Sequence, residues 1–108
     1  MEYVKVANVA DFATLRVKSF RILTRYVGVF KEDDGTFRAI EVACKHQNAD
    51  LTQGKIKGDI AICPWHGWRY NLRTGECLWG NKGKLRPYGC KVENDVIYIT
   101  LNPLQSWE

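Results

Sequence analysis

The sequence predicts an all-β fold, in which an antiparallel β-sandwich forms a base that carries a small, loop-rich unit. Residues 16–22 alternate polar and apolar side chains, which is the period of a half-buried strand. The tetrapeptide Glu32-Asp33-Asp34-Gly35 separates two strand-like segments, and Asp-Gly tolerates the positive φ of a tight hairpin turn. Near the end of the chain, Glu93-Asn94-Asp95 separates two more such segments. Hairpins of this kind build antiparallel sheets.

The single elements follow in chain order. Residues 9–15 have room for one helical turn with Asn8 as its N-cap, and no longer helix is expected. Seven strands are predicted, at residues 16–22, 26–30, 36–42, 60–62, 68–72, 88–92 and 96–101. The last two form a closing hairpin. Residues 102–108 are expected to be a loosely held tail, in which Trp107 could dock on the surface.

Length and composition limit the function. A chain of 108 residues with 45% apolar and 26% charged residues is expected to be one globular domain, 1–108. Its apolar runs are too short for a membrane span and no secretory signal is visible, so we expect a cytoplasmic protein. The net charge of +4 is moderate, and Lys and Arg are spread along the chain without a dense cluster, which argues against nucleic-acid binding and suits an acidic protein partner.

Residues 43–83 differ from the rest of the chain. Their strand-like segments are short, glycine is frequent, and three of the four cysteines lie there. We therefore expect a loop-rich insertion that carries the functional site. In a cytoplasmic chain, cysteines are more often ligands, catalytic groups or buried thiols than halves of disulfides. Cys90 alternates with Tyr88 and Val92 and is predicted to be a buried thiol, and a Cys77–Cys90 disulfide has little support.

Two compact Cys–His pairs in this region contain both histidines of the chain. Cys44-Lys45-His46 follows a predicted strand, and after a gap of sixteen residues Cys63-Pro64-Trp65-His66 follows the apolar segment 60–62. Two loops at one end of a β base could clamp a single metal centre. Zn²⁺ accepts two Cys and two His, but zinc fingers pair like with like. A Cys nucleophile needs one base and an orienting group, which leaves the second pair unexplained. One thiolate and one imidazole from each loop suit a binuclear iron centre.

At this point the sequence resembles the Rieske [2Fe–2S] family, whose motif is C-x-H, a gap of similar length, and C-x-x-H. The likeness includes Gly67, the strand-like residues 68–72 and the turn at 73–76, and it extends over residues 3–101. It implies the Rieske fold, one [2Fe–2S] cluster, and a cluster-binding subdomain at 43–83. By resemblance, one iron is bound by two thiolates and the other by two neutral imidazoles, and these four ligands are Cys44, Cys63, His46 and His66.

The resemblance also bears on the reduction potential. Two thiolates and two imidazoles leave the oxidised cluster formally neutral, which eases addition of an electron. Respiratory members add a disulfide between the two loops and a serine that donates to a cluster sulfur. Ala49 and Trp65 stand in the disulfide positions and Trp68 in the serine position, so we expect a low potential for the family, about −150 mV. Gln47, Trp65, Gly67 and Trp68 are expected to surround the cluster, the two tryptophans keeping water off it.

The family members that the chain resembles are the ferredoxin components of bacterial aromatic-ring dioxygenases and toluene-type monooxygenases. His46-Gln47 and Trp68 are most similar to the monooxygenase ferredoxins. The resemblance implies an electron carrier that is not catalytic alone. It would take single electrons from a flavin-containing reductase and pass them through its histidine edge to a terminal oxygenase. Residues 78–84 depart from the family, because they lack the proline-containing loop that covers the cluster in many relatives.

Three lysines, Lys45, Lys82 and Lys84, are close in sequence to the predicted cluster. Solvated charge is the default interpretation of each, and the hypothesis is that they form a docking rim for an acidic partner. Two other functions stay open. One is a zinc-stabilised interaction module. The other is a small subunit of a reductase complex, similar to the nitrite reductase small subunit, although those chains often lack the ligands.

Overall fold

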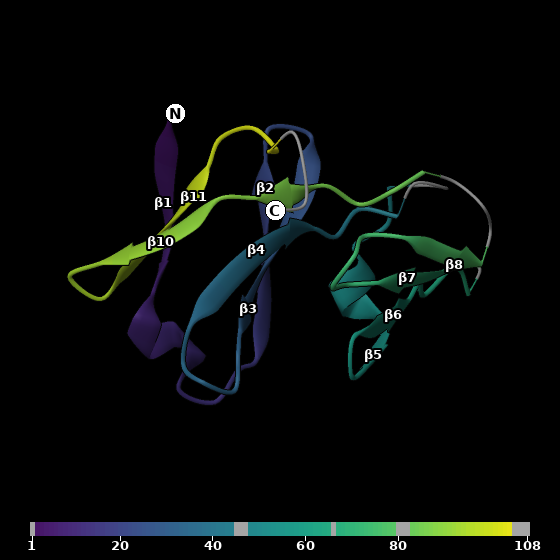
Figure 1. The fold of residues 1–108 in the computed structure, drawn as a ribbon, viewed down its shortest axis with the longest axis horizontal. Helices are drawn as coiled ribbons and strands as arrows, with labels where there is room; N and C mark the ends of the chain where they lie inside the picture. Colours follow the sequence, from purple (N-terminus) through teal and green to yellow (C-terminus); the bar gives the residue numbers. More distant parts are fainter. Residues whose placement is uncertain (1, 45–47, 66, 80–82, 105–108) are drawn as a thin grey trace.

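The computed structural model describes residues 2–44, 48–65, 67–79 and 83–104, and it consists largely of antiparallel β-sheet (Figure 1). The strands form three sheets, called here the outer, central and small sheets. In spatial order they are β1 (Tyr3–Asn8), β11 (Val96–Thr100) and β10 (Cys90–Glu93) in the outer sheet; β2 (Val17–Ile22), β3 (Arg25–Lys31), β4 (Phe37–Glu41) and β9 (Pro87–Tyr88) in the central sheet; and β5 (Lys55–Lys57), β6 (Ile60–Ile62), β7 (Arg69–Asn71) and β8 (Cys77–Trp79) in the small sheet. The prediction of an all-β fold is confirmed.

The central sheet lies between the other two, and its two faces belong to separate cores (Figure 1). Successive side chains of a strand point to opposite faces. Val27, Val29 and Ala39 therefore pack toward the outer sheet, where Ile97 and Ile99 are fully buried. On the other face, Phe30, Ile40 and Val42 belong to one core with Ala61, Tyr70 and Leu72 of the small sheet and the turn after it. Two strands, β3 and β4, thus support both halves of the molecule.

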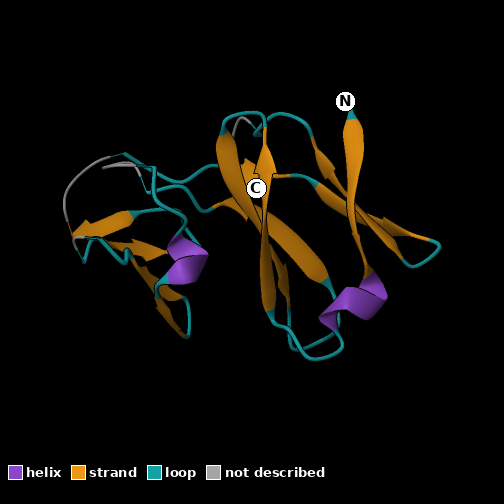
Figure 2. Ribbon diagram, turned by 180° about the vertical axis from the view of Figure 1, so that it is seen from behind, coloured by secondary structure: helices purple, strands orange, loops and turns teal. Residues whose placement is uncertain are grey.

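The predicted helical turn is present but short. It is a 3₁₀ turn, η1 (Val9–Phe12), and it ends before the expected residue 15. The carboxylate of Asp11 accepts a hydrogen bond from the backbone N–H of Asn8 at 2.9 Å, which satisfies one free donor at the start of the turn. A second 3₁₀ turn, η2 (Leu51–Gln53), was not predicted, and the Asp50 side chain caps it. Figure 2 shows the two turns beside different sheets.

The two predicted hairpins are confirmed, with one correction. Asn94 and Asp95 both have positive φ, 53° and 64°, which is the type I′ geometry that matches strand twist. The predicted strand 88–92 is wrong as a single strand, because the chain changes sheets at Gly89. A Cβ atom on Gly89 would lie 2.8 Å from Cγ2 of Thr100, so a larger residue at this crossing would force the buried Thr100 side chain to shift. β1 was not predicted and pairs with β11 along the edge of the molecule.

The segment 43–83 is more regular than the predicted loop-rich unit. The expected short strands at 60–62 and 68–72 are present, and β5 and β8 flank them. Three residues are too few to show a hydrophobic period, which explains why β5 and β8 were missed. That this unit, within a single domain, binds a cluster stays a prediction. The predicted docking of Trp107 lies outside the described residues. Within the described residues, no helix is long and apolar enough to cross a membrane.

Candidate metal centre

The structure brings the two predicted cysteine ligands into one core. Cys44 follows the end of β4 and Cys63 follows β6, and both belong to the core between the central and small sheets. Their exposed fractions are 1% and 3%, so water hardly reaches either sulfur. All four cysteines of the chain are free thiols. The two thiols are thus buried on separate elements of one core, and their role as iron ligands stays a prediction.

The two cysteine loops share one backbone arrangement, although their sequences differ. In each, the cysteine N–H donates to the carbonyl five residues later, and the cysteine carbonyl accepts from the N–H four residues later; the partners are Ala49 (2.8 Å) and Asn48 (2.7 Å) for Cys44, and Trp68 (2.7 Å) and Gly67 (3.1 Å) for Cys63. The fourth residue after each cysteine has positive φ, 55° at Asn48 and 75° at Gly67. Asn and Gly are the residues that adopt this conformation most readily.

Sequence reasoning missed the hydroxyl of Tyr70, which lies 3.6 Å from the sulfur of Cys44. Tyr70 is fully buried in β7, on the face of the small sheet that points into the core. A thiolate ligand has no proton to give, so with Cys44 ionised the tyrosine hydroxyl must be the donor. The sequence did offer a clue to this contact, because Tyr70 lies at an alternate position of the predicted strand 68–72, which follows the second Cys–His loop.

The two tryptophans of the second loop have different surroundings. Trp68 is half-buried and packs against the core that holds both cysteines. Trp65 has 62% of its surface exposed, although it was expected to shield the cluster in the same way. Ala49, which takes a disulfide position of the respiratory proteins, is buried beside the first cysteine. Trp68 is therefore the better placed of the two to keep water from the site, and this role stays a prediction.

The remaining predicted site residues lie outside the described part of the chain. They are His46, His66 and Gln47, together with two of the three rim lysines, Lys45 and Lys82. Within the described residues, no three His, Cys, Asp or Glu side chains gather as a metal site, which is consistent with the predicted set contributing only its cysteines there. Of the segment 78–84, the structure describes Leu78 and Lys84 as exposed.

The two cysteines outside the motif have ordinary packing roles in the structure. Cys77 lies opposite Tyr70 in the small sheet and contacts the core of the cysteine loops. Cys90 is half-buried against the other core, and burial raises the pKa of its thiol to about 11. A thiol with that pKa stays protonated and unreactive at neutral pH. Cys90, which was predicted to be a buried thiol, is thus only partly buried in the structure.

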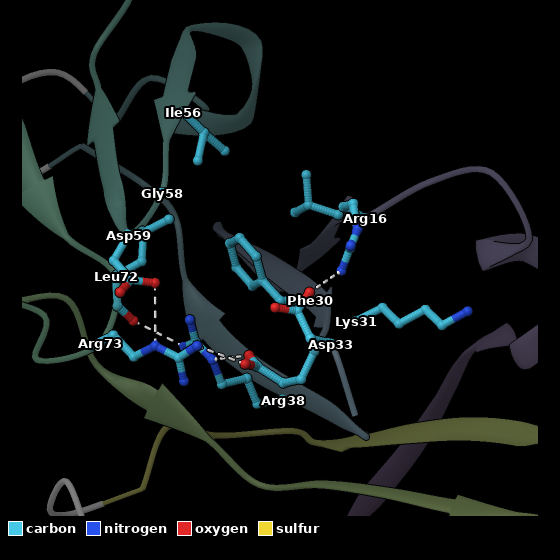
Figure 3. A pocket seen from close by; sticks show the side chains of 12 residues that line it. Arg16, Phe30, Lys31, Asp33, Arg38, Ile56, Gly58, Asp59, Leu72 and Arg73 are labelled. Carbon is cyan, nitrogen blue, oxygen red and sulfur yellow. Dashed lines mark hydrogen bonds and ion pairs between the residues drawn. The ribbon is translucent and has the colours of Figure 1, made fainter. Parts of the chain in front are cut away.

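A cleft of about 520 Å³ lies between the central and small sheets (Figure 3), and neither motif cysteine lines it. Arg38 and Arg73 both donate to the carboxylate of Glu32, each at 2.6 Å, and Arg73 also pairs with Asp59 at 3.1 Å. Burial tends to raise the pKa of Glu32, but the hydrogen bonds and charges of Arg73 and Arg38 outweigh it and hold this pKa below its ordinary value. Glu32, Arg38, Arg73 and Asp59 are thus paired with one another, and these ion pairs act as a clamp between the central sheet and the small sheet.

Comparison with known proteins identifies the family. The family model described as the Rieske [2Fe-2S] domain matches residues 2–89. The chain belongs to the Rieske [2Fe-2S] domain family. The resemblance inferred from the four-residue motif is thereby confirmed, and a Rieske-type [2Fe–2S] cluster is the cofactor that the family implies.

Several relatives of this Rieske domain are known. The oxygenase component of 3-ketosteroid-9-alpha-monooxygenase from Rhodococcus rhodochrous is 33% identical over 67 residues, which are 62% of this chain and 17% of that protein. The chain thus spans about a sixth of that relative's length. Among solved structures, a chain in the complex of reduced oxygenase and oxidised ferredoxin of carbazole 1,9a-dioxygenase superposes with a TM-score of 0.78 at 24% identity, covering 96% of this chain and 97% of that one. The ferredoxin of carbazole 1,9a-dioxygenase from Nocardioides aromaticivorans IC177 gives 0.75 at 24% identity, covering 93% and 98%. These structures share the fold.

The described part of the site fits the cofactor of the family. Iron–sulfur clusters are held by deprotonated cysteines, and hydrogen bonds to the sulfurs and exclusion of solvent tune their reduction potential. Cys44 and Cys63 are buried in an apolar core, their loops are closed by backbone hydrogen bonds, and Tyr70 offers a hydroxyl to one sulfur.

Proposed function

We propose that this Rieske domain is a one-electron carrier that delivers electrons to an oxygenase. The observation that carries the proposal is the pair of buried cysteines on two equivalent loops, in a chain that belongs to the Rieske family. Under the proposal, Cys44 and Cys63 hold one iron and His46 and His66 the other, with residues 43–83 as the binding unit. The bound cluster supplies reversible one-electron chemistry at a potential set by its ligands.

The residues around the ligands would hold the site in one geometry. The backbone hydrogen bonds of the two loops fix the directions of the cysteine side chains, because each loop is closed on both sides of its cysteine. The hydroxyl of Tyr70 donates to Cys44 and stabilises negative charge on that sulfur. Trp68 and the apolar core keep water from the inner side. A site held in one geometry changes its structure little when it gains an electron, which lowers the reorganisation energy of electron transfer.

The partners in the proposal are a flavin-containing reductase that supplies the electron and a terminal oxygenase that receives it. The ferredoxin of carbazole 1,9a-dioxygenase forms a complex with its oxygenase, which supports the second partner by analogy. In this arrangement the domain is not catalytic alone. Cys77 and Cys90, the two cysteines outside the motif, are not joined in a disulfide, which supports a reducing compartment, so we propose the cytoplasm.

The curated relatives support a second candidate, in which the same Rieske domain serves as the electron-entry part of an oxygenase. An antibody blot of the host extract separates the two candidates. A band near 12.4 kDa fits the separate carrier, and a band several times larger fits the oxygenase component.

Metal and sulfide analysis of the purified protein tests the proposal. We expect two irons and two acid-labile sulfides per chain, and a protein that accepts one electron from dithionite. Replacing Cys44, Cys63, His46 or His66 by alanine should abolish the cluster. Cys77→Ala and Cys90→Ala are the matched controls, because they remove a thiol outside the motif and should keep it. One equivalent of zinc without sulfide would favour the interaction module and contradict the carrier.

A further inference from the structure

The net charge of the chain is confined to the unit that holds the candidate site. Residues 43–84 contain seven of the sixteen Lys and Arg but only three of the twelve Asp and Glu, so this segment carries the full +4. The rest of the chain has nine basic and nine acidic residues and is neutral. A molecule with such an asymmetry turns its charged end toward an oppositely charged partner during encounter.

Strand register divides the small sheet into two faces of opposite character. Residues directly opposite each other on antiparallel strands point to the same side. One row, Ile56–Ala61–Tyr70–Cys77, points into the core of the cysteine loops. The neighbouring rows, Lys55–Ile62–Arg69 and Lys57–Ile60–Asn71, therefore point the other way.

This outward face presents basic groups around an apolar centre. Lys55, Lys57 and Arg69 are exposed, while Ile60 and Ile62 between them are half-buried. The three cations form no ion pair with a described residue. By contrast, Arg73 at the opposite edge of the unit is already paired with Glu32 and Asp59.

The face continues toward the candidate metal centre. Ile62 directly precedes Cys63, and Arg69 directly follows Trp68, so one row of the face flanks both ends of the second cysteine loop. That loop carries Trp65, which is 62% exposed and directly precedes the predicted ligand His66 in the sequence. A large exposed aromatic beside a basic rim is typical of the centre of a protein interface.

We propose that the outward face of the small sheet, together with Trp65, is the surface on which an acidic protein partner docks. The inference rests on the proposed electron-carrier function and adds the position and chemistry of the docking site. A carboxylate-lined partner would be steered by Lys55, Lys57 and Arg69 and held by burial of Ile60, Ile62 and Trp65. Its contact would lie next to the second cysteine loop, where the path for an electron is short.

The lysines have a simpler interpretation, and the test must distinguish it from docking. β5 is an edge strand of the small sheet, and charged side chains on edge strands prevent edge-to-edge aggregation. Glutamate at these positions keeps the edge charged but reverses the sign. The variant K55E/K57E/R69E therefore preserves the protective role while destroying the proposed docking role.

The experiment measures binding of an acidic redox protein, the soluble haem domain of cytochrome b5, to immobilised protein at several salt concentrations. We expect K55E/K57E/R69E to weaken binding about tenfold or more at low salt and to remove most of the salt dependence. The matched control K5E/K18E/R86E changes the net charge equally at exposed positions outside the small sheet and should change binding less than about threefold. Trp65→Ala should weaken binding at every salt concentration.

Electron transfer supplies the second readout. Each dithionite-reduced molecule gives one electron to one ferric haem, and the second-order rate should fall with binding in K55E/K57E/R69E. The rate with cytochrome c, a basic protein, should rise in the same variant. Equal weakening by both triple variants, or no effect of K55E/K57E/R69E, would overturn the docking surface. If the cluster can still be reduced in that case, the proposed electron-carrier function stands. A wild-type protein without a cluster would overturn both.

Discussion

The hydroxyl of Tyr70 lies 3.6 Å from the sulfur of Cys44, and this contact joins β7 of the small sheet to the loop that follows β4 of the central sheet. Tyr70→Phe removes the hydroxyl and leaves the ring in place. Because the donor stabilises the added negative charge of the reduced state, we expect the reduction potential to fall by about 40 mV, the equivalent of 1 kcal/mol for one electron.

Tyr98→Phe is the control for this change. It removes a hydroxyl from β11 of the outer sheet, away from the cysteine core, and should leave the potential unchanged. Protein-film voltammetry gives both values. An unchanged potential in Tyr70→Phe, with the cluster retained, would show that the hydroxyl does not act on the sulfur.

Gly67→Ala tests the shared geometry of the two cysteine loops. The positive φ of 75° at Gly67 is strained for alanine and should cost about 1–2 kcal/mol of stability. Gly35→Ala imposes comparable strain at φ 87°, in a hairpin of the central sheet. Both should lower the melting temperature, but only Gly67→Ala should lower the iron content of freshly purified protein. Equal iron content in the two variants would contradict a role of the loop geometry in cluster binding.

Stability should depend on acid pH through Glu32. Its pKa is lower in the folded protein than the ordinary 4.5, so its contribution is complete above that value and is lost as the pH falls through the lower folded pKa. At pH 7, Glu32→Gln should lower the melting temperature by several degrees, because two arginines lose a charged partner. The difference from wild type should shrink as the pH falls below 4.5.

Asp33→Asn is the matched control for the clamp. Asp33 pairs with Arg16 at 2.8 Å, but both side chains are largely exposed, and such pairs contribute little. Its melting temperature should follow wild type at every pH. A constant difference between Glu32→Gln and wild type from pH 7 to pH 3 would show that the carboxylate does not act through its charge.

The wild-type reduction potential should lie near the low end of the family range, about −150 mV. Ala49 is buried where a disulfide cysteine would stand, and Trp68 takes the place of a serine donor. Tyr70 adds one donor that the sequence argument did not count, so the value should lie above that of Tyr70→Phe. A potential well above zero would contradict the link between donors and potential.

The sequence was sufficient for the hairpins and for the motif, because both depend on local signals. Asp-Gly at 34–35 and the spacing from Cys44 to His66 can be read directly from neighbouring residues. The contact of Tyr70 with Cys44 and the sheet change at Gly89 could not be read, since each depends on a segment at least eleven residues away. The exposure of Trp65 could not be read either, because hydrophobicity does not reveal which side of a loop a side chain takes.

The sharing of β3 and β4 between two cores means that the small sheet is not a portable cassette. Its inner face, with Ala61 and Tyr70, is covered by Phe30, Ile40 and Val42 of the central sheet. A fragment cut at residues 43 and 84 would expose this face to water and lose the strand that leads into Cys44. Transplanting the site into another protein would therefore require moving the central strands with it.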